Sequence, residues 1–288
     1  MRVFDLHCDT LTSPVGHVSL EHSRLFKQWV QVFAVFVPDR LQGQAAVEYC
    51  DQVIDSYYAQ LDEMVKHCTP ILAIENGNAL AGDLSRLEML AQKQVKAITL
   101  TWNGENELGY GAACDPALGL KPFGKQAVQR MCELNILPDV SHLNEAGFWE
   151  VARFGRPLLA THSNCAAITP HVRNLNDDQL KAMFASGGLV GLCLCQEFLG
   201  EAGDAKAVAR HLEHVLALGG EHHVALGSDF DGCSIHPSLA GAERLPGLNE
   251  SLAQMGFDDN IREKFFWSNA ANFFEKQVRQ HETPPSNS

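Results

Sequence analysis

The sequence lacks long hydrophobic runs, basic clusters and an apolar leader. No stretch of about 18 consecutive apolar residues occurs, so we expect no transmembrane helix. Lys and Arg occur at most in pairs and the net charge is −13, which argues against nucleic acid and anionic membranes as partners. Because no charged and apolar leader precedes the first apolar segment, we also expect no signal peptide.

The motifs of several enzyme classes are missing as well. No Gly-x-Ser-x-Gly motif is present, which argues against a serine hydrolase, and "GGLVG" lacks the context of a phosphate loop. No linker rich in Pro, Gly or Ser divides the chain, so we expect one catalytic domain over residues 1–278 and a polar tail over residues 279–288. The nine cysteines are odd in number and scattered, and we interpret them as reduced thiols of a cytoplasmic protein.

Eight short apolar segments are present instead, each rich in Val, Ile, Leu or Phe. They are "RVFDLHC", "VQVFAVFV", "PILAIEN", "VKAITLTW", "ILPDVSH", "PLLATHS", "GLVGLCLC" and "HVALGSDF". Runs of about six to eight such residues are typical of strands that are buried on both faces.

Helix-like stretches separate these segments. Two of them begin with an asparagine that can cap a helix, Asn144 and Asn176, and two end in paired glycines. Eight alternations of strand and helix predict a single (β/α)₈ barrel, an α/β fold. The weakest unit is the first, because residues 12–29 contain little obvious helix, and a doubly wound open sheet is the alternative.

Residues that can bind metal ions occur at the ends of five predicted strands. They are His7 and Asp9 after the first strand, Glu75 after the third, His142 after the fifth, His162 after the sixth and Asp229 after the eighth. The carboxyl ends of barrel strands open onto one face, so these side chains would surround one cavity. Two sets of His and carboxylate that share a bridging carboxylate would form a two-metal site, with ions about 3.5–4 Å apart.

Each of these residues also has an ordinary interpretation. A lone histidine at a strand end is usually exposed or hydrogen-bonded, and only the coincidence of several favours a metal site. Glu75 is the least ordinary, because an unpaired buried carboxylate is costly or becomes neutral. Asp231 is expected to shape the loop after Asp229, although a supporting role behind the metal ligands stays open.

Two further groups of candidates are weaker. Cys193 and Cys195 form a C-x-C pair on the seventh predicted strand, and we interpret both as small hydrophobic residues of the core. His222 and His223 precede the eighth strand and are expected to be solvated.

Four segments carry a resemblance to a known family. "DLHCDTL", "DVSHLNEAGFWEV", "THSNCAAITPHVRNLNDDQL" and "VALGSDFDG" together resemble the membrane dipeptidase (renal dipeptidase) family of zinc metallopeptidases. The resemblance runs from Asp5 to about Phe274 and is to the leaderless bacterial members. It implies a zinc-dependent barrel hydrolase that cleaves dipeptides, and a homodimer is a further expectation at the level of the family.

The resemblance also implies residue roles. His7 and Asp9 would bind one Zn²⁺, His142 and His162 would bind a second, and Glu75 would bridge the two ions. These ions would activate a bridging water as the hydroxide nucleophile.

Two further positions match the family. Asp229 matches its acid/base carboxylate and would carry the proton to the leaving amine. Arg173 matches an arginine that holds the substrate, whereas on sequence alone it could be a surface arginine paired with Asp177 or Asp178.

One departure from the family concerns the fourth strand. It ends in "LTWN", so that Trp102 stands where the family commonly has a substrate-binding histidine. Asn103 or Asn106 could replace that polar group in binding the substrate. The departure leaves two alternatives open: a barrel hydrolase of another amide, N-acyl amino acid, ester or lactone, and a metal-binding protein without turnover.

Overall fold

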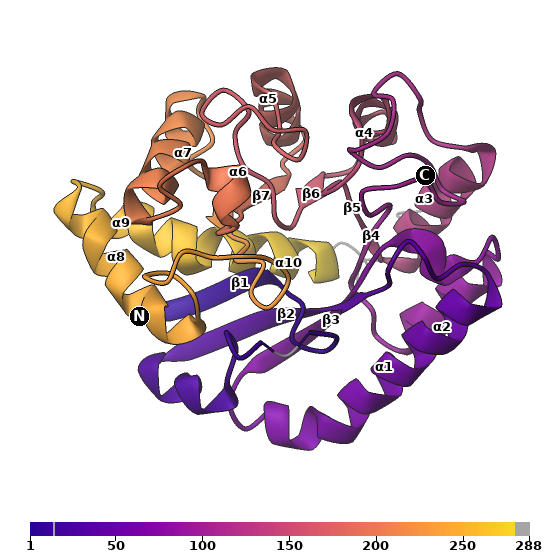
Figure 1. The fold of residues 1–288 in the computed structure, drawn as a ribbon, viewed down its shortest axis with the longest axis horizontal. Coiled ribbons are helices and arrows are strands. Elements are labelled where there is room, and N and C mark those ends of the chain that lie inside the picture. Colours follow the sequence, from indigo (N-terminus) through magenta and orange to yellow (C-terminus); the bar gives the residue numbers. More distant parts are fainter. Residues whose placement is uncertain (14, 280–288) are drawn as a thin grey trace, which may run out of the picture.

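The computed structural model describes residues 1–13 and 15–279. Eight parallel strands pair in chain order and close into a barrel, because Asp5 of the first strand lies opposite Leu226 of the last (Figure 1). The strands are β1 (Arg2–Cys8), β2 (Gln28–Phe36), β3 (Thr69–Glu75), β4 (Ala97–Thr99), β5 (Leu137–Asp139), β6 (Leu159–Ala160), β7 (Leu189–Leu192) and β8 (Val224–Leu226). The predicted (β/α)₈ barrel is therefore confirmed, and the open sheet is excluded.

The later strands are shorter than the sequence predicts. β4 to β8 contain two to four residues each, because the second half of each apolar segment leaves the ladder and enters the loop above the barrel. Two glycines in this region allow a close approach of neighbouring strands. A Cβ at Gly191 or Gly227 would lie 2.0 or 1.9 Å from the carbonyl oxygen of Thr161. His142, His162 and Asp229 consequently follow their strands by two or three residues rather than ending them.

Helices surround the barrel in Figure 1. They are α1 (Gln44–Met64), α2 (Ser85–Gln92), α3 (Pro122–Leu134), α4 (Glu145–Ala152), α5 (Asp177–Ala185), α6 (Gln196–Leu199), α7 (Ala205–Ala217), α8 (Leu245–Gln254), α9 (Asp259–Glu263) and α10 (Asn269–Arg279). Asn144 and Asn176 cap α4 and α5 as predicted, since their side chains accept hydrogen bonds from the backbone N–H of Gly147 and Gln179. The first unit contains only a short 3₁₀ helix, η1 (Leu20–Leu25), in agreement with its weak pattern.

The amino end of the barrel is filled by apolar side chains. Phe4 and Leu6 of β1 pack there with residues of the other strands and with Phe273 of α10. The Phe4 ring also lies 5.1 Å from the ring of Phe274 and 6.2 Å from that of Trp267. α10 therefore closes this end of the barrel, and the polar residues described below gather at the opposite end.

Three further expectations concern the chain as a whole. No helix in residues 1–13 and 15–279 is long and apolar enough to cross a membrane. All nine cysteines lie in the described part of the chain and all are free thiols. Most of the predicted tail, residues 280–288, lies outside the described residues, and the predicted boundary at residue 278 falls inside α10.

Candidate metal centre and active site

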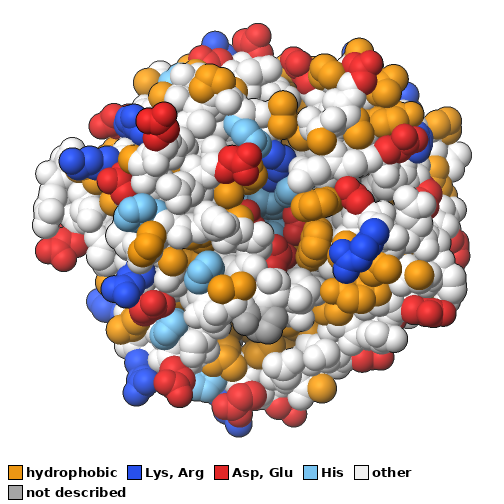
Figure 2. Space-filling view, viewed as in Figure 1, with side chains coloured by type: hydrophobic (Ala, Val, Ile, Leu, Met, Phe, Trp, Pro, Cys, Tyr) orange, Lys and Arg blue, Asp and Glu red, His pale blue; other side chains and the backbone are white. Residues whose placement is uncertain are grey.

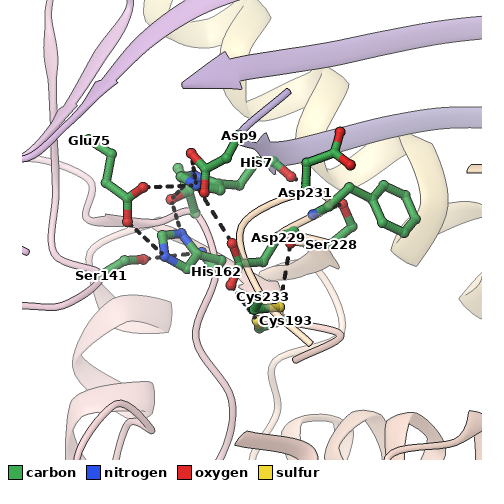
Figure 3. A network of polar contacts seen from close by, with 12 residues as sticks. His7, Asp9, Glu75, Ser141, His162, Cys193, Ser228, Asp229, Asp231 and Cys233 are labelled. Carbon is green, nitrogen blue, oxygen red and sulfur yellow. Dashed lines mark hydrogen bonds and ion pairs between the residues drawn. The ribbon is translucent and has the colours of Figure 1, made fainter. Parts of the chain in front are cut away.

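The six predicted metal-type residues come together at the carboxyl end of the barrel, and Figure 3 labels five of them: His7, Asp9, Glu75, His162 and Asp229. His7 Nε2 lies 3.7 Å from Asp9 Oδ1 and 4.0 Å from Asp229 Oδ1. His142 Nε2 and His162 Nε2 are 2.8 Å apart. All six residues are buried, and Cys8 between His7 and Asp9 packs into the apolar core, as the alternation along β1 predicts.

Glu75 lies between two groups of donors. Its Oε2 atom is 3.5 Å from His7 Nε2, whereas its Oε1 atom is 2.9 Å from His142 Nε2 and 3.6 Å from His162 Nε2. One oxygen thus faces His7 and Asp9 and the other faces the histidine pair. This is the arrangement that a carboxylate needs to bridge two ions.

The histidine pair offers two lone pairs to one point. His142 Nδ1 donates to Asn103 Oδ1 at 2.9 Å, so the lone pair of this neutral imidazole is on Nε2. His162 Nδ1 donates at 2.9 Å to the hydroxyl of Thr161, which itself donates to Asp139, so its lone pair is also on Nε2. Burial lowers the pKa of both histidines well below 6.5 and keeps them neutral. Two lone pairs that face each other require a cation, and a metal ion fits there.

The second group of donors, His7 and Asp9, also needs a cation as its binding partner. His7 Nε2 and Asp9 Oδ1 are buried and have no hydrogen-bond partner in the described part of the chain. Burial and the charge of Asp9 raise the pKa of Glu75 to about 8, and burial raises the pKa of Asp229 to about 7. Three carboxylates in one buried site repel each other, and bound cations would relieve this repulsion. Imidazole nitrogen with carboxylate oxygen is a donor set that Zn²⁺ accepts.

Two of the same residues have a strained backbone. His142 and Asp229 have φ values of 66° and 61°, in the left-handed region that side chains other than glycine rarely adopt. Gly232 is required by close packing, because a Cβ there would lie 2.1 Å from Asp9 Oδ2 and 2.4 Å from Asp229 Oδ1. The loops above the barrel are therefore shaped around the carboxylates.

A comparison with known proteins decides the family. The membrane dipeptidase family (peptidase family M19) matches residues 2–286 of the sequence. The chain belongs to this family. Membership places the protein among metal-dependent dipeptidases and confirms the resemblance carried by the sequence motifs.

Individual proteins are similar over most of the chain. An uncharacterized protein in the pqqA 5′ region of Klebsiella pneumoniae is 35% identical over 209 residues, which cover 68% of this chain and 77% of that protein. The crystal structure of "dipeptidase AC", an M19 metallopeptidase, has 28% identity and a TM-score of 0.89, covering 96% of this chain and 98% of that one.

A second solved structure carries a ligand. It is a metallopeptidase from Rhodobacter sphaeroides with a phosphinate mimic of the dipeptide L-Ala-D-Ala. It has 27% identity and a TM-score of 0.87, covering 96% of this chain and 99% of that one.

In this M19 chain Arg173 is a buried cation rather than a surface residue. Its exposed fraction is 4%, and its Nη2 donates to the carbonyl oxygen of His162 at 3.3 Å. Its Nε has no hydrogen-bond partner among residues 1–13 and 15–279, and the guanidinium lies 5.3 Å from the Phe198 ring. Asp177 pairs with His214 instead, so the alternative of a solvated ion pair of Arg173 with Asp177 is wrong.

The three candidate residues after β4 have different roles. Trp102 lines the cavity, where its ring lies 5.2 Å from that of Phe36. Asn103 lines the same cavity and also orients His142 through the hydrogen bond given above. Asn106 is buried in its own loop, where its Oδ1 accepts from the N–H of Leu108 and its Nδ2 donates to Asn76. Of the two asparagines, Asn103 is therefore the one that can meet a substrate.

An open cavity of about 440 Å³ leads to these residues. Figure 2 shows it as a hollow near the centre of the face, with carboxylates and histidines at its floor. Apolar and charged side chains share its wall. They include Phe36, Pro38, Arg40, Trp102, Phe198 and Cys233. The size is suitable for a small ligand.

Three other sequence interpretations can be compared with the structure. Cys193 and Cys195 are buried as predicted, but they lie beyond β7 and outside the connected clusters of apolar side chains, with Cys193 Sγ 3.4 Å from Asp229 Oδ2. Asp231 shapes the loop, since its carboxylate accepts from the N–H groups of Gly16 and His17 and from the Thr10 hydroxyl. His222 is exposed as predicted, but the half-buried His223 donates from Nδ1 to the carbonyl oxygen of Gly188 at 2.8 Å.

Sequence reasoning missed the buried groups that support the site. Asp139 accepts from the hydroxyls of Thr99 and Thr161 and from the N–H of Ser141, so it connects β4, β5 and β6 beneath the histidines. Asp5 accepts from Ser228 and Gln31 in the same way near Asp229. The available signal was a carboxylate inside an otherwise apolar strand, in "VFDLH" and "LPDVS".

Proposed function

We propose that the protein is a binuclear zinc dipeptidase. The observation that carries the proposal is the position of Glu75, whose two oxygens face two separate groups of buried nitrogen and oxygen donors. A mononuclear site would leave one of these groups unsatisfied. His7 and Asp9 would hold one Zn²⁺ with Glu75 Oε2, and His142 and His162 would hold the other with Glu75 Oε1.

The bound ions would supply an activated water and polarise the scissile carbonyl. The rest of the chemistry belongs to the chain. Asp229 is buried at the cavity floor with Oδ1 facing His7, and its pKa of about 7 is suitable for accepting and returning a proton near neutral pH. We assign to it the proton transfer from water to the leaving amine.

Arg173 supports a dipeptide as substrate. A buried guanidinium with an unpartnered Nε is costly unless an anion binds it, and the C-terminal carboxylate of a dipeptide is such an anion. The phosphinate mimic of a dipeptide in the Rhodobacter sphaeroides relative agrees with this substrate class for that protein. Trp102 and Asn103, which line the cavity, would also contact the substrate.

A panel of substrates tests the proposal. Protein loaded with Zn²⁺ should hydrolyse dipeptides faster than N-acyl amino acids, esters and lactones, and elemental analysis should find two ions per chain. Glu75→Ala should lose both ions, since each of them uses this carboxylate. Hydrolysis of lactones or N-acyl amino acids without dipeptide turnover would contradict the proposal, as would two tightly held ions in Glu75→Ala.

Two other expectations stay predictions. The homodimer can be checked by light scattering of the purified chain, and the cytoplasmic location by fractionation of cells that express it. Neither is needed for the chemistry above, because the six proposed site residues all come from one chain.

A further inference from the structure

Three cysteines lie together beside the catalytic centre. Cys193 and Cys195 follow β7, and Cys233 lies in the loop after β8. Cys195 N donates to Cys193 Sγ at 3.4 Å, and the Sγ atoms of Cys193 and Cys233 lie within 4.8 Å of each other. Cys193 and Cys195 are buried, whereas Cys233 is half-buried and lines the cavity that leads to Glu75 and Asp229. The cluster is therefore reachable from solvent through the active site.

Asp229 connects this cluster to the proposed zinc ligands. Its Oδ2 lies 3.4 Å from Cys193 Sγ, whereas its Oδ1 faces His7 at 4.0 Å (Figure 3). Donor atoms of Cys193, Cys233 and Asp229 all lie within 4.8 Å of one another. Ligands of one tetrahedral ion with metal–sulfur bonds of about 2.3 Å are separated by less than this distance, so small shifts would complete the coordination.

The two loops that carry the thiols are held together by the backbone. Gln196 N donates to Ser234 O at 3.0 Å, and Cys195 pairs with Ile235 in an isolated bridge. Asn164 Oδ1 also accepts from Cys193 N at 2.9 Å. Because these bonds fix both loops, little ordering is required before an ion can bind.

Burial raises the pKa of Cys193 well above 9.0, so the thiol is protonated until a cation displaces its proton. The positive charge of Arg173 interacts with Cys193 and Asp229 and offsets part of the negative charge of a deprotonated cluster. Sulfur donors select soft, thiophilic ions, whereas the proposed catalytic ligands offer only nitrogen and oxygen.

We propose that Cys193, Cys233 and Asp229 form a third, inhibitory metal site for a thiophilic divalent ion such as Zn²⁺ or Cd²⁺. The thiols release their protons to solvent as the metal–sulfur bonds form, and no oxidation occurs. The ion binds Asp229 Oδ2 and prevents this carboxylate from carrying a proton. Binding stands independently of the proposed function, whereas inhibition rests on the proposed role of Asp229.

Cadmium is the probe that separates this site from the catalytic pair. A sulfur-to-cadmium charge-transfer band in the ultraviolet can arise only from cysteine ligands, and none of the proposed catalytic ligands is a cysteine. Reduced, zinc-loaded protein titrated with Cd²⁺ should acquire this band with one equivalent, and kcat should fall in parallel while KM changes little.

Serine variants identify the cysteines that give rise to the band. Cys233→Ser and Cys193→Ser should lose it and bind Cd²⁺ at least about tenfold more weakly, with both zinc ions retained as evidence of folding. Cys132→Ser is the matched control, because Cys132 is a half-buried thiol on α3, outside the cluster, and this variant should behave as the wild type.

Three outcomes would overturn the proposal or part of it. Absence of a sulfur band in the wild type, or its persistence in both Cys193→Ser and Cys233→Ser, overturns the site. Inhibition without a sulfur band places the ion in the catalytic pair and also overturns it. A band without inhibition confirms the site, overturns its inhibitory effect and removes the proton-transfer role of Asp229.

Discussion

At the scale of single residues, Asp229 is the group on which the proposed chemistry depends most. Its carboxylate is buried and its backbone is strained, and Asn has nearly the same shape but cannot carry a proton. We expect Asp229→Asn to reduce kcat by about 10²–10⁴-fold, the usual contribution of a general acid or base. Steady-state kinetics with elemental analysis checks this. Loss of a metal ion in the variant would show that Asp229 is a ligand instead.

Arg173 gives a second prediction at this scale. Arg173→Ala should lose about 2 kcal/mol or more in kcat/KM on a dipeptide, because it removes the partner of a buried carboxylate. It should lose little on the same dipeptide with an amidated C-terminus. Arg153→Ala is the control for lost charge, since Arg153 is exposed at the end of α4. Equal losses on the acid and the amide would show that Arg173 does not bind a carboxylate.

The residue scale also shows what the sequence could not predict. The sequence predicted that His7, Glu75 and His162 lie together, because all three were placed at strand ends and the carboxyl ends of parallel strands share one face. The partners of Asp139 and the neighbours of Cys193 come from other strands, so no local pattern encodes them. The same limit explains the interpretation of Cys193 as a core residue: alternation predicts the face of a side chain but not what that face contacts.

At the scale of elements, the loop between β6 and α5 carries Arg173, and a helix cap fixes its far end. Asn176 Oδ1 accepts from Gln179 N at 2.9 Å, and Gln179 Oε1 accepts from Asn176 N at 2.9 Å. We expect Asn176→Ala to lower the free energy of unfolding by about 1 kcal/mol. The exposed Asn260 of α9 is the control, and Asn260→Ala should change this free energy by less than about 0.5 kcal/mol. Denaturant unfolding of both variants measures the difference, and equal values would contradict the capping role.

Element positions were predicted better than element lengths. All eight strands lie inside the predicted segments or within two residues of them, because strands buried on both faces need continuous apolar runs. Their ends were not predictable, since a strand ends where its neighbour stops pairing. α10 shows a further limit, because no pattern in its sequence indicates that it fills the end of the barrel.

At the scale of the whole molecule, metal removal should reverse the dependence of stability on pH. In the native state the pKa of Glu75 is raised to about 8 and the pKa of Asp229 to about 7. The pKa of His7 is raised well above 6.5, because the charges of Glu75 and Asp9 outweigh the effect of burial. Between pH 6.5 and about 8 the metal-free native state therefore holds more protons than the unfolded chain, so its stability falls as pH rises.

The metal-loaded protein should behave oppositely, because its ligands are already deprotonated and metal binding strengthens as protons leave. Thermal unfolding with and without chelator at pH 6.5 and 8 measures the two dependences. The increase in Tm caused by metal should be larger at pH 8. An increase that is equal at both pH values would contradict the carboxylate-rich, cation-dependent site described here.

The closure of the barrel end by α10 has a consequence for protein synthesis. β1 pairs with β8, and Phe4 packs against Phe274, so the first strand made by the ribosome contacts the last helix of the described chain. These contacts span almost the whole sequence, which is the kind of topology that folds slowly. β1 remains without its partner β8 and without the α10 helix until nearly all of the chain has been translated, and during this interval its apolar face is exposed to aggregation.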